Sequence, residues 1–199
     1  MKNITPAPPK DTWTWKYYTW TNYFNKEEVK QISEFIEKNY SGYEDPELGA
    51  KTADGNYKKQ ISTVKTIHYG TVEPLISRLV GEAFSVANMQ FGYTTFGPHL
   101  DLGLLYNTYQ AKDKDYYNWH FDNSNSPTHD VKLTLLVNLS TDTYEGGKFQ
   151  LENEWTDVSV LDRAGSALIF KSHIQHRVLP VTFGTRKSLA MFIHGPKFL

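Results

Sequence analysis

The sequence predicts a mainly β protein of the α+β class, with a double-stranded β-helix (jelly roll) core and buttressing helices near the N-terminus. From Met89 onward, short apolar segments alternate with turn signals such as Glu145-Gly146-Gly147 and Phe183-Gly184-Thr185. Many short strands at this spacing are typical of a sandwich or barrel. Before that point, two segments show the apolar spacing of helices that lie against a sheet, and the combination favours a jelly roll.

The composition indicates one domain without a strong charge preference. A chain of 199 residues with no evident linker can bury a sizeable core, so we expect a single domain over residues 1–199. In it, residues 1–88 would support a jelly-roll core formed by residues 89–199. The formal net charge of -1 gives no sign of general attraction to nucleic acid or anionic lipid. The chain has no cysteine, which excludes disulfides, thiol nucleophiles and sulfur-ligated metals.

The N-terminus lacks an apolar signal core, and no apolar run is long enough to cross a membrane. We therefore expect a soluble, cytoplasmic protein with no membrane partner. The composition does not indicate an oligomeric state.

The N-terminal half should contain two strands and two helices. The aromatic-rich segment Trp13–Tyr23 predicts an edge strand. A helix is expected over Asn25–Asn39, because its first residue can cap the free amides and Glu28 can complete a capping box. The β-branched residues of Ile61–Tyr69 predict a strand. A second helix should follow Pro74, a residue that suits the first turn.

Between these elements, Ser41–Gln60 is polar, charged and rich in glycine, and the sequence leaves open whether it is a lid or a disordered insertion. In the C-terminal half we expect strands around Gln90–Phe96, Leu102–Tyr109, Tyr116–Phe121, Val131–Leu139, Lys148–Leu151, Val158–Leu161, Ala167–Lys171, Arg177–Val181 and Lys187–His194.

His120 and Asp122 stand two residues apart in the segment YYNWHFDN, which has the pattern of a strand. Both side chains should therefore point to the same face. An imidazole and a carboxylate placed in this way are two of the three ligands of the facial triad that binds non-haem Fe(II). Such a pair also arises by chance, and His99 and Asp101 form a second one. We interpret this second pair as structural, because it lacks the neighbouring tyrosine-rich strand.

A triad needs one more histidine, and His176 in SHIQHRVLPV is the candidate. His173 is its rival, but on a strand its odd offset would put it on the opposite face from His176. Ten residues after His176, Arg186 offers a planar guanidinium that can hold a carboxylate through two parallel hydrogen bonds. Ser188 should share the face of Arg186 and could add a hydroxyl hydrogen bond.

As an ordered set, the segments LLYNTY, YYNWHFDN, LTLLVNLS, YEGGKFQL, VLDRAGSALIF and HRVLPVTFGTRKSL resemble the 2-oxoglutarate- and Fe(II)-dependent oxygenases, in their prolyl 4-hydroxylase-like branch. The resemblance covers about the C-terminal half of the chain. It implies that His120, Asp122 and His176 are the metal ligands and form the catalytic centre. It also implies that Arg186 anchors 2-oxoglutarate, with help from Ser188.

The resemblance further implies that Tyr109 reaches the same carboxylate as Arg186. Its spacing to His120 is one residue longer than in some relatives, so Tyr106 remains an alternative. Collagen-type relatives often carry Lys where this chain has Arg186, and this departure weakens any expectation of collagen-like substrates. Asp122 argues against halogenation, because halogenating relatives lack that carboxylate.

The implied activity is that of a dioxygenase that uses Fe(II), O2 and 2-oxoglutarate as co-substrate, with ascorbate as an optional addition, to hydroxylate a C–H bond. The expected substrate is a peptidyl proline held under Ser41–Gln60. A free amino acid or other small metabolite is the rival substrate. A catalytically inactive jelly-roll binding module is a further alternative, although a binder does not need the full ligand set and its anchor. Action on nucleic acid is disfavoured by the near-neutral charge.

Overall fold

Two antiparallel sheets and two helices make up most of the structure, a computed structural model that describes residues 16–40, 60–122, 126–152 and 156–197. The major sheet has six strands, in the spatial order β1 (Tyr17–Trp20), β10 (Ala167–Lys171), β6 (His129–Asn138), β13 (Thr185–Pro196), β4 (Gly103–Gln110) and β3 (Thr63–His68). The minor sheet has five, in the order β2 (Gln60–Ile61), β5 (Tyr116–His120), β11 (His176–Val178), β8 (Phe149–Leu151) and β9 (Thr156–Asp157). A short pair joins β12 (Val181–Phe183) to β7 (Glu145–Gly146).

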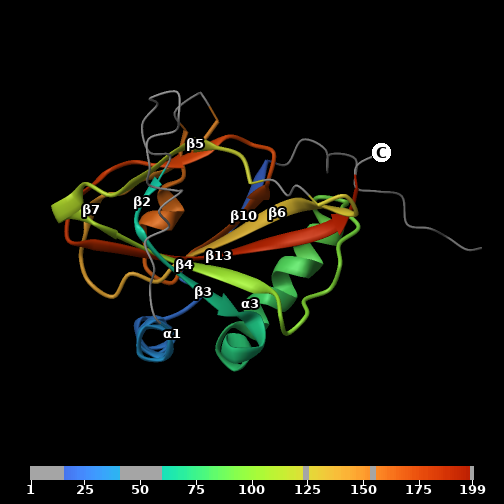
Figure 1. The fold of residues 1–199 in the computed structure, drawn as a ribbon, viewed down its shortest axis with the longest axis horizontal. Helices are drawn as coiled ribbons and strands as arrows, with labels where there is room; N and C mark the ends of the chain where they lie inside the picture. Colours follow the sequence, from blue (N-terminus) through green and yellow to red (C-terminus); the bar gives the residue numbers. More distant parts are fainter. Residues whose placement is uncertain (1–15, 41–59, 123–125, 153–155, 198–199) are drawn as a thin grey trace, which may run out of the picture.

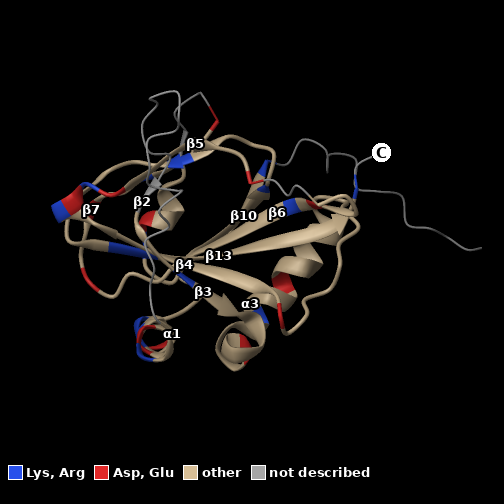
Figure 2. Ribbon diagram, in the orientation of Figure 1, with Lys and Arg blue, Asp and Glu red and all other residues tan. Residues whose placement is uncertain are grey.

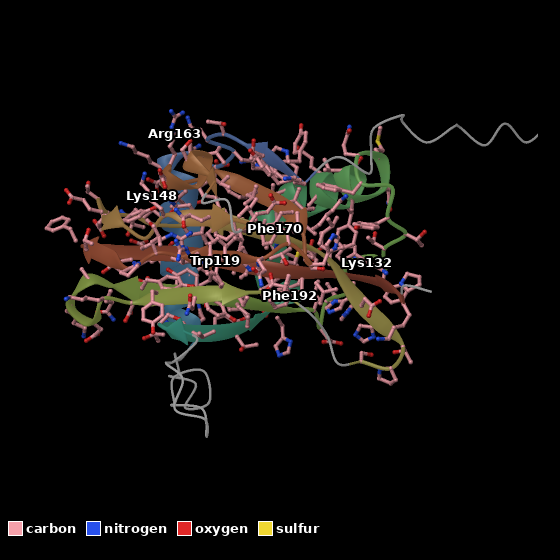
Figure 3. The ribbon with its side chains drawn as sticks, turned by 90° about the horizontal axis from the view of Figure 1, so that it is seen from above. Trp119, Lys132, Lys148, Arg163, Phe170 and Phe192 are labelled. Atoms are coloured by element: carbon pink, nitrogen blue, oxygen red, sulfur yellow. The ribbon has the colours of Figure 1, made fainter. Side chains whose placement is uncertain are left out.

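The helices α1 (Lys26–Asn39) and α3 (Tyr69–Met89) lie on one side of the major sheet, and β2 and β5 lie on its other side (Figure 1). Seen from above, β6, β13, β4 and β3 run side by side with α1 beneath them (Figure 3). This is the jelly-roll arrangement that the sequence predicts. The division of the chain at residue 88 stays a prediction, although β1, β2 and β3 pair with strands that follow residue 88.

Helix α1 begins as its sequence indicates. Asn25 accepts a hydrogen bond from the Glu28 amide at 3.0 Å, and the Glu28 carboxylate accepts one from the Asn25 amide at 2.8 Å. This reciprocal capping box satisfies two amides that the first turn leaves free. Val29, Ile32 and Ile36 then fall on the buried face that packs toward the sheet.

Helix α3 begins five residues before Pro74, so the predicted start is wrong by more than one turn. The amides of Tyr69 and Gly70 donate to the carbonyls of Leu102 and Leu100, each at 2.8 Å. These tertiary hydrogen bonds hold an additional first turn that proline chemistry alone does not indicate. Pro74 is the sixth residue of the helix, beyond the first four amides that lack intrahelical partners, so it removes the hydrogen bond that an amide at this position would donate to the Gly70 carbonyl.

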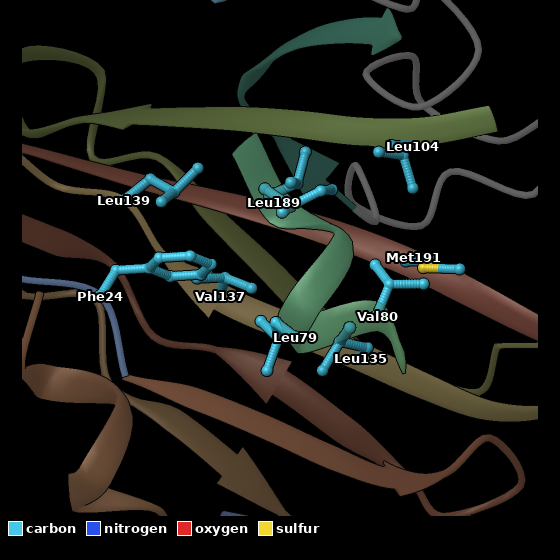
Figure 4. A pocket seen from close by; sticks show the side chains of 10 residues that line it. Phe24, Leu79, Val80, Leu104, Leu135, Val137, Leu139, Leu189 and Met191 are labelled. Atoms are coloured by element: carbon cyan, nitrogen blue, oxygen red, sulfur yellow. The ribbon is translucent and has the colours of Figure 1, made fainter. Parts of the chain in front are cut away.

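The larger core lies between α3 and the major sheet. Leu79 and Val80 of the helix meet Leu104, Leu135 and Met191 of the strands (Figure 4). The space left among these side chains is about 10 Å³, roughly the room of one water molecule. The side chains therefore fill the space between α3 and the sheet.

Two predicted strands are absent. Residues of Gln90–Phe96 form no strand, because amides there complete the end of α3: those of Phe91 and Tyr93 donate to Val86 and Ala87 at 3.3 and 3.1 Å. In place of a strand over Val158–Leu161, Ser159–Asp162 forms a 3-10 helix. The segment Ser41–Gln60, which we expected to be a lid or an insertion, lies outside the described residues except for Gln60.

Strand alternation gives the major sheet two different faces. On β4, Leu104 and Tyr106 enter the helix-side core, whereas Leu105, Asn107 and Tyr109 line a cavity on the side of the minor sheet. On β13 the same alternation puts Leu189, Met191 and Ile193 in the core and Arg186, Ser188, Ala190 and Phe192 at the cavity. The polar side chains that the sequence singled out therefore converge between the two sheets.

Basic and acidic residues are interspersed over the described ribbon, for example along α1 (Figure 2). Neither described helix combines the length and the apolar character that a membrane crossing requires.

Candidate metal centre

A β-bulge in β5 brings the candidate ligands together. His176 of β11 lies opposite His120, but Val178 lies opposite Tyr117, so β5 carries one more residue than its partner between these pairs. The additional residue turns Tyr117 and His120 to the same face despite their odd separation. The sequence had indicated that Asp122 lies within the same strand as His120. β5 ends at His120, however, so Asp122 lies just beyond the strand.

His120, Asp122 and His176 form one cluster whose potential ligand atoms lie within 4.8 Å of one another. The Nε2 atom of His120 lies 3.6 Å from Oδ1 of Asp122, and Nε2 of His176 lies 3.3 Å from Oδ2. Both histidines are buried, with 6% and 4% of their surface exposed. Among the residues that the structure describes, no other group of three His, Asp or Glu side chains brings its potential ligand atoms this close together.

Backbone carbonyls fix the tautomer of each histidine. Nδ1 of His120 lies 2.7 Å from the Asn118 carbonyl oxygen, and Nδ1 of His176 lies 3.0 Å from that of Ile174. A carbonyl oxygen can only accept, so each Nδ1 carries the proton. In the neutral ring, Nε2 then presents a lone pair toward the cluster, which is the arrangement that metal-binding histidines use.

Asp122 supplies a negative charge to the same point. Burial raises the pKa of the Asp122 carboxyl, but hydrogen bonding and charge from the protonated form of His176, the charge of protonated His120 and a hydrogen bond from Thr134 together hold it below its usual value. A metal cation bound by the two imidazole lone pairs would also compensate the buried negative charge of this carboxylate. Two histidines and one carboxylate on one face, with the remaining positions open, suit Fe(II), so these residues fit the metal that the sequence implies.

The cluster lines a cavity of about 240 Å³ between the two sheets. Its described lining has a polar end at Arg186, Ser188, Asn107 and Tyr109, and apolar walls that include Val64, Leu105, Ala190 and Phe192. The cavity therefore has room for a small organic ligand beside the metal position.

Arg186 is the unusual residue of this cavity, because its guanidinium is almost wholly buried. Only 1% of its surface is exposed, and its Nε has no hydrogen-bond partner among the described residues. Nη1 donates to the Ser188 hydroxyl at 3.3 Å, and the guanidinium lies 5.5 Å from the centre of the Tyr109 ring. A buried cation of this kind needs an anion, and the carboxylate of an oxoacid matches its planar fork.

The structure separates Tyr109 from its alternative, Tyr106. Tyr109 lines the cavity and pairs with Arg186 across β4 and β13. Tyr106 points to the opposite face, where its hydroxyl donates to the Glu37 carboxylate at 3.0 Å. Tyr109, and not Tyr106, is therefore placed to meet a ligand held by Arg186.

Gly147 allows the loop after β7 to approach Arg186. Its φ of +59° is rarely adopted by other residues, and an added Cβ would lie 2.8 Å from the Arg186 Cδ and 3.0 Å from Val181. The turn that the sequence predicts at Glu145-Gly146-Gly147 thus helps to enclose the guanidinium.

The rival residues lie elsewhere. His173 is exposed in the turn between β10 and β11, and it is not part of the cluster. His99 and Asp101 are exposed in the loop before β4. The structure thus brings together His120, Asp122 and His176 and places none of the three rivals with them.

Among the cavity residues that the sequence reasoning missed, Tyr117 and Thr134 contact candidate metal ligands. The Tyr117 ring stacks on the His120 imidazole, with centroids 3.5 Å apart and planes at 14°, but the bulge that causes this leaves no sequence signal. Thr134 donates a hydrogen bond to Oδ2 of Asp122 at 2.7 Å. A signal for Thr134 did exist, since it is a polar residue in an otherwise apolar run, Leu133–Val137.

Comparisons with known proteins agree with this geometry. Residues 104–194 match the family model described as the 2OG-Fe(II) oxygenase superfamily. A PKHD-type hydroxylase of Shewanella sp. strain MR-7 is 28% identical over 184 residues, which cover 87% of this chain and 76% of that protein.

Solved structures show the same fold. A prolyl-4-hydroxylase of Pseudomonas putida superposes with a TM-score of 0.66 at 14% identity, over 94% of this chain and 96% of that one. A prolyl hydroxylase of Trichoplax adhaerens, in complex with a peptide fragment of the hypoxia inducible factor oxygen degradation domain, gives a TM-score of 0.62 at 20% identity, over 89% and 83%. The family match over residues 104–194, the hydroxylase relatives and the shared fold together support a 2OG-Fe(II) oxygenase, that is, a dioxygenase with a prolyl hydroxylase-like jelly roll.

Proposed function

We propose that this dioxygenase hydroxylates a prolyl residue within a peptide, with Fe(II) held by His120, Asp122 and His176 and 2-oxoglutarate anchored by Arg186. The observation that carries the assignment of the co-substrate site is the buried Arg186 guanidinium in the cavity that also contains the three ligands. When bound, Fe(II) and 2-oxoglutarate supply the activation of O2, and the reaction converts the oxoacid and a C–H group to succinate, CO2 and a hydroxylated product.

The residues of the chain would divide the remaining tasks. Arg186, with Ser188 and Tyr109, would orient the distal carboxylate of the oxoacid at the polar end of the cavity. Tyr117 would hold the His120 ring by stacking, and burial raises the pKa of its hydroxyl, as does the charge of Asp122, so the hydroxyl stays protonated. The apolar walls would exclude water from the reacting carbon.

The lining of the cavity favours a neutral aliphatic group over a free amino acid. Among the described residues that line it, Arg186 is the only Lys or Arg. That cation is needed for the oxoacid, so the carboxylate of a free amino acid would lack a positively charged partner there. A prolyl ring in a peptide carries no charge and suits walls such as Leu105 and Phe192. The relatives support the same reading, since one of the superposed prolyl hydroxylases holds a peptide.

Incubation with Fe(II), 2-oxoglutarate and O2 tests the substrate. We expect proline-containing peptides to gain one oxygen by mass spectrometry, with matching formation of succinate. The same peptides with alanine in place of proline should remain unchanged. The Asp122→Ala variant should oxidise neither the proline-containing nor the alanine-containing peptides. Oxidation of free proline, with no oxidation of any peptide, would contradict the proposed substrate and favour a small-metabolite hydroxylase.

A further inference from the structure

Thr134 occupies a rigid position directly beside the candidate metal centre. It lies in the middle of β6, with Phe170 of β10 opposite it on one side and Phe192 of β13 on the other. Its exposure is 1%, and its hydroxyl donates to Oδ2 of Asp122 at 2.7 Å. A short hydrogen bond to an ionised acceptor is among the stronger ones in proteins, and here it starts from a central strand of the major sheet.

Asp122 needs such a tether more than the histidines do. His120 and His176 belong to paired strands, and a backbone carbonyl holds the Nδ1 of each ring. Asp122 follows the end of β5, and its amide donates to the Ser172 carbonyl at 3.1 Å. That backbone hydrogen bond fixes the main chain but leaves the side-chain torsions free. The hydrogen bond from Thr134 restrains one oxygen of this carboxylate, Oδ2, from a strand of the major sheet, independently of the two histidines.

We propose that Thr134 is a positioning residue that orients the Asp122 carboxylate for the metal and keeps it to a single coordinating oxygen. This inference rests on the metal assignment in the proposed function. By engaging Oδ2, the Thr134 hydroxyl makes coordination through both carboxylate oxygens less favourable. A carboxylate that binds through one oxygen leaves three positions of an octahedral ion for an oxoacid and O2.

The test compares metal binding to variants of the full chain without any turnover. Thr134→Val keeps the side-chain shape and removes the hydroxyl, whereas Thr134→Ser keeps the hydroxyl. Thr108→Val is the matched control: it makes the same change on β4, on the face opposite to that of Asn107 and Tyr109. Affinity for Co(II) is measured by titration calorimetry, the visible absorption spectrum of bound Co(II) reports its coordination, and the melting temperature of the metal-free protein reports folding.

We expect Thr134→Val to weaken Co(II) binding by about 10- to 100-fold, the usual effect of removing a partner of a metal ligand, and to change the spectrum. Thr134→Ser should restore both properties, and Thr108→Val should leave both unchanged. If Thr134→Val does not fold, Thr134→Ala against Thr134→Ser gives the same comparison. Wild-type affinity and spectrum in the variants without the hydroxyl would overturn the role of Thr134 alone. Absence of Co(II) binding to the wild-type protein would overturn the metal assignment as well.

Discussion

His176→Ala is expected to abolish 2-oxoglutarate turnover and leave a folded protein. His176 supplies one of three ligands, and loss of its Nε2 would leave the metal with His120 and Asp122 alone. The stability of the fold comes mainly from the apolar core between α3 and the major sheet, which this substitution does not touch. Formation of succinate measures the first effect and thermal unfolding the second. His120→Ala and Asp122→Ala should behave in the same way.

His173→Ala is the matched control, because it removes a histidine three residues away that is exposed. It should retain the turnover of the wild-type protein. Iron-dependent formation of succinate in His176→Ala, together with its loss in His173→Ala, would show that the third ligand has been assigned to the wrong histidine.

Arg186→Ala should raise the 2-oxoglutarate concentration required for turnover by at least about tenfold, because a charge-assisted pair of about 1.5–3 kcal/mol is lost. Arg186→Lys should be milder, since it keeps the charge but loses the planar fork. The measurement is the dependence of succinate formation on 2-oxoglutarate concentration.

Arg163→Ala serves as the control for Arg186, since Arg163 is exposed after the 3-10 helix at Ser159–Asp162 and is not among the residues that line the cavity. It should leave the 2-oxoglutarate requirement unchanged. An unchanged requirement in Arg186→Ala would mean that another cation of the chain anchors the oxoacid.

Residues with distinctive chemistry could be placed from the sequence, because strand alternation decides which side chains share a face. Arg186 and Ser188 are two apart on β13 and both line the cavity. His173 was excluded by the same argument, but in the structure it is excluded because it lies in the turn before β11, where strand alternation does not apply. The capping box of α1 could also be predicted from the sequence, since it depends on local residues alone.

Features that depend on contacts distant in sequence could not be placed. The bulge in β5 arises from pairing with β11, about sixty residues later in the chain, and it decides that Tyr117 rather than a neighbour stacks on His120. The choice between Tyr106 and Tyr109 likewise depended on the register of β4 against β13. The early start of α3 required carbonyls from the loop that precedes β4.

An anaerobic titration with Fe(II) and 2-oxoglutarate tests the central claim most directly, because it requires the metal ligands and the Arg186 anchor to act on one chelate. We expect a visible charge-transfer band that appears only when both are present and saturates at one equivalent of iron. The band should be absent in His176→Ala and should require more 2-oxoglutarate in Arg186→Ala. Wild-type protein that is folded but shows no band at saturating Fe(II) and 2-oxoglutarate would contradict the account.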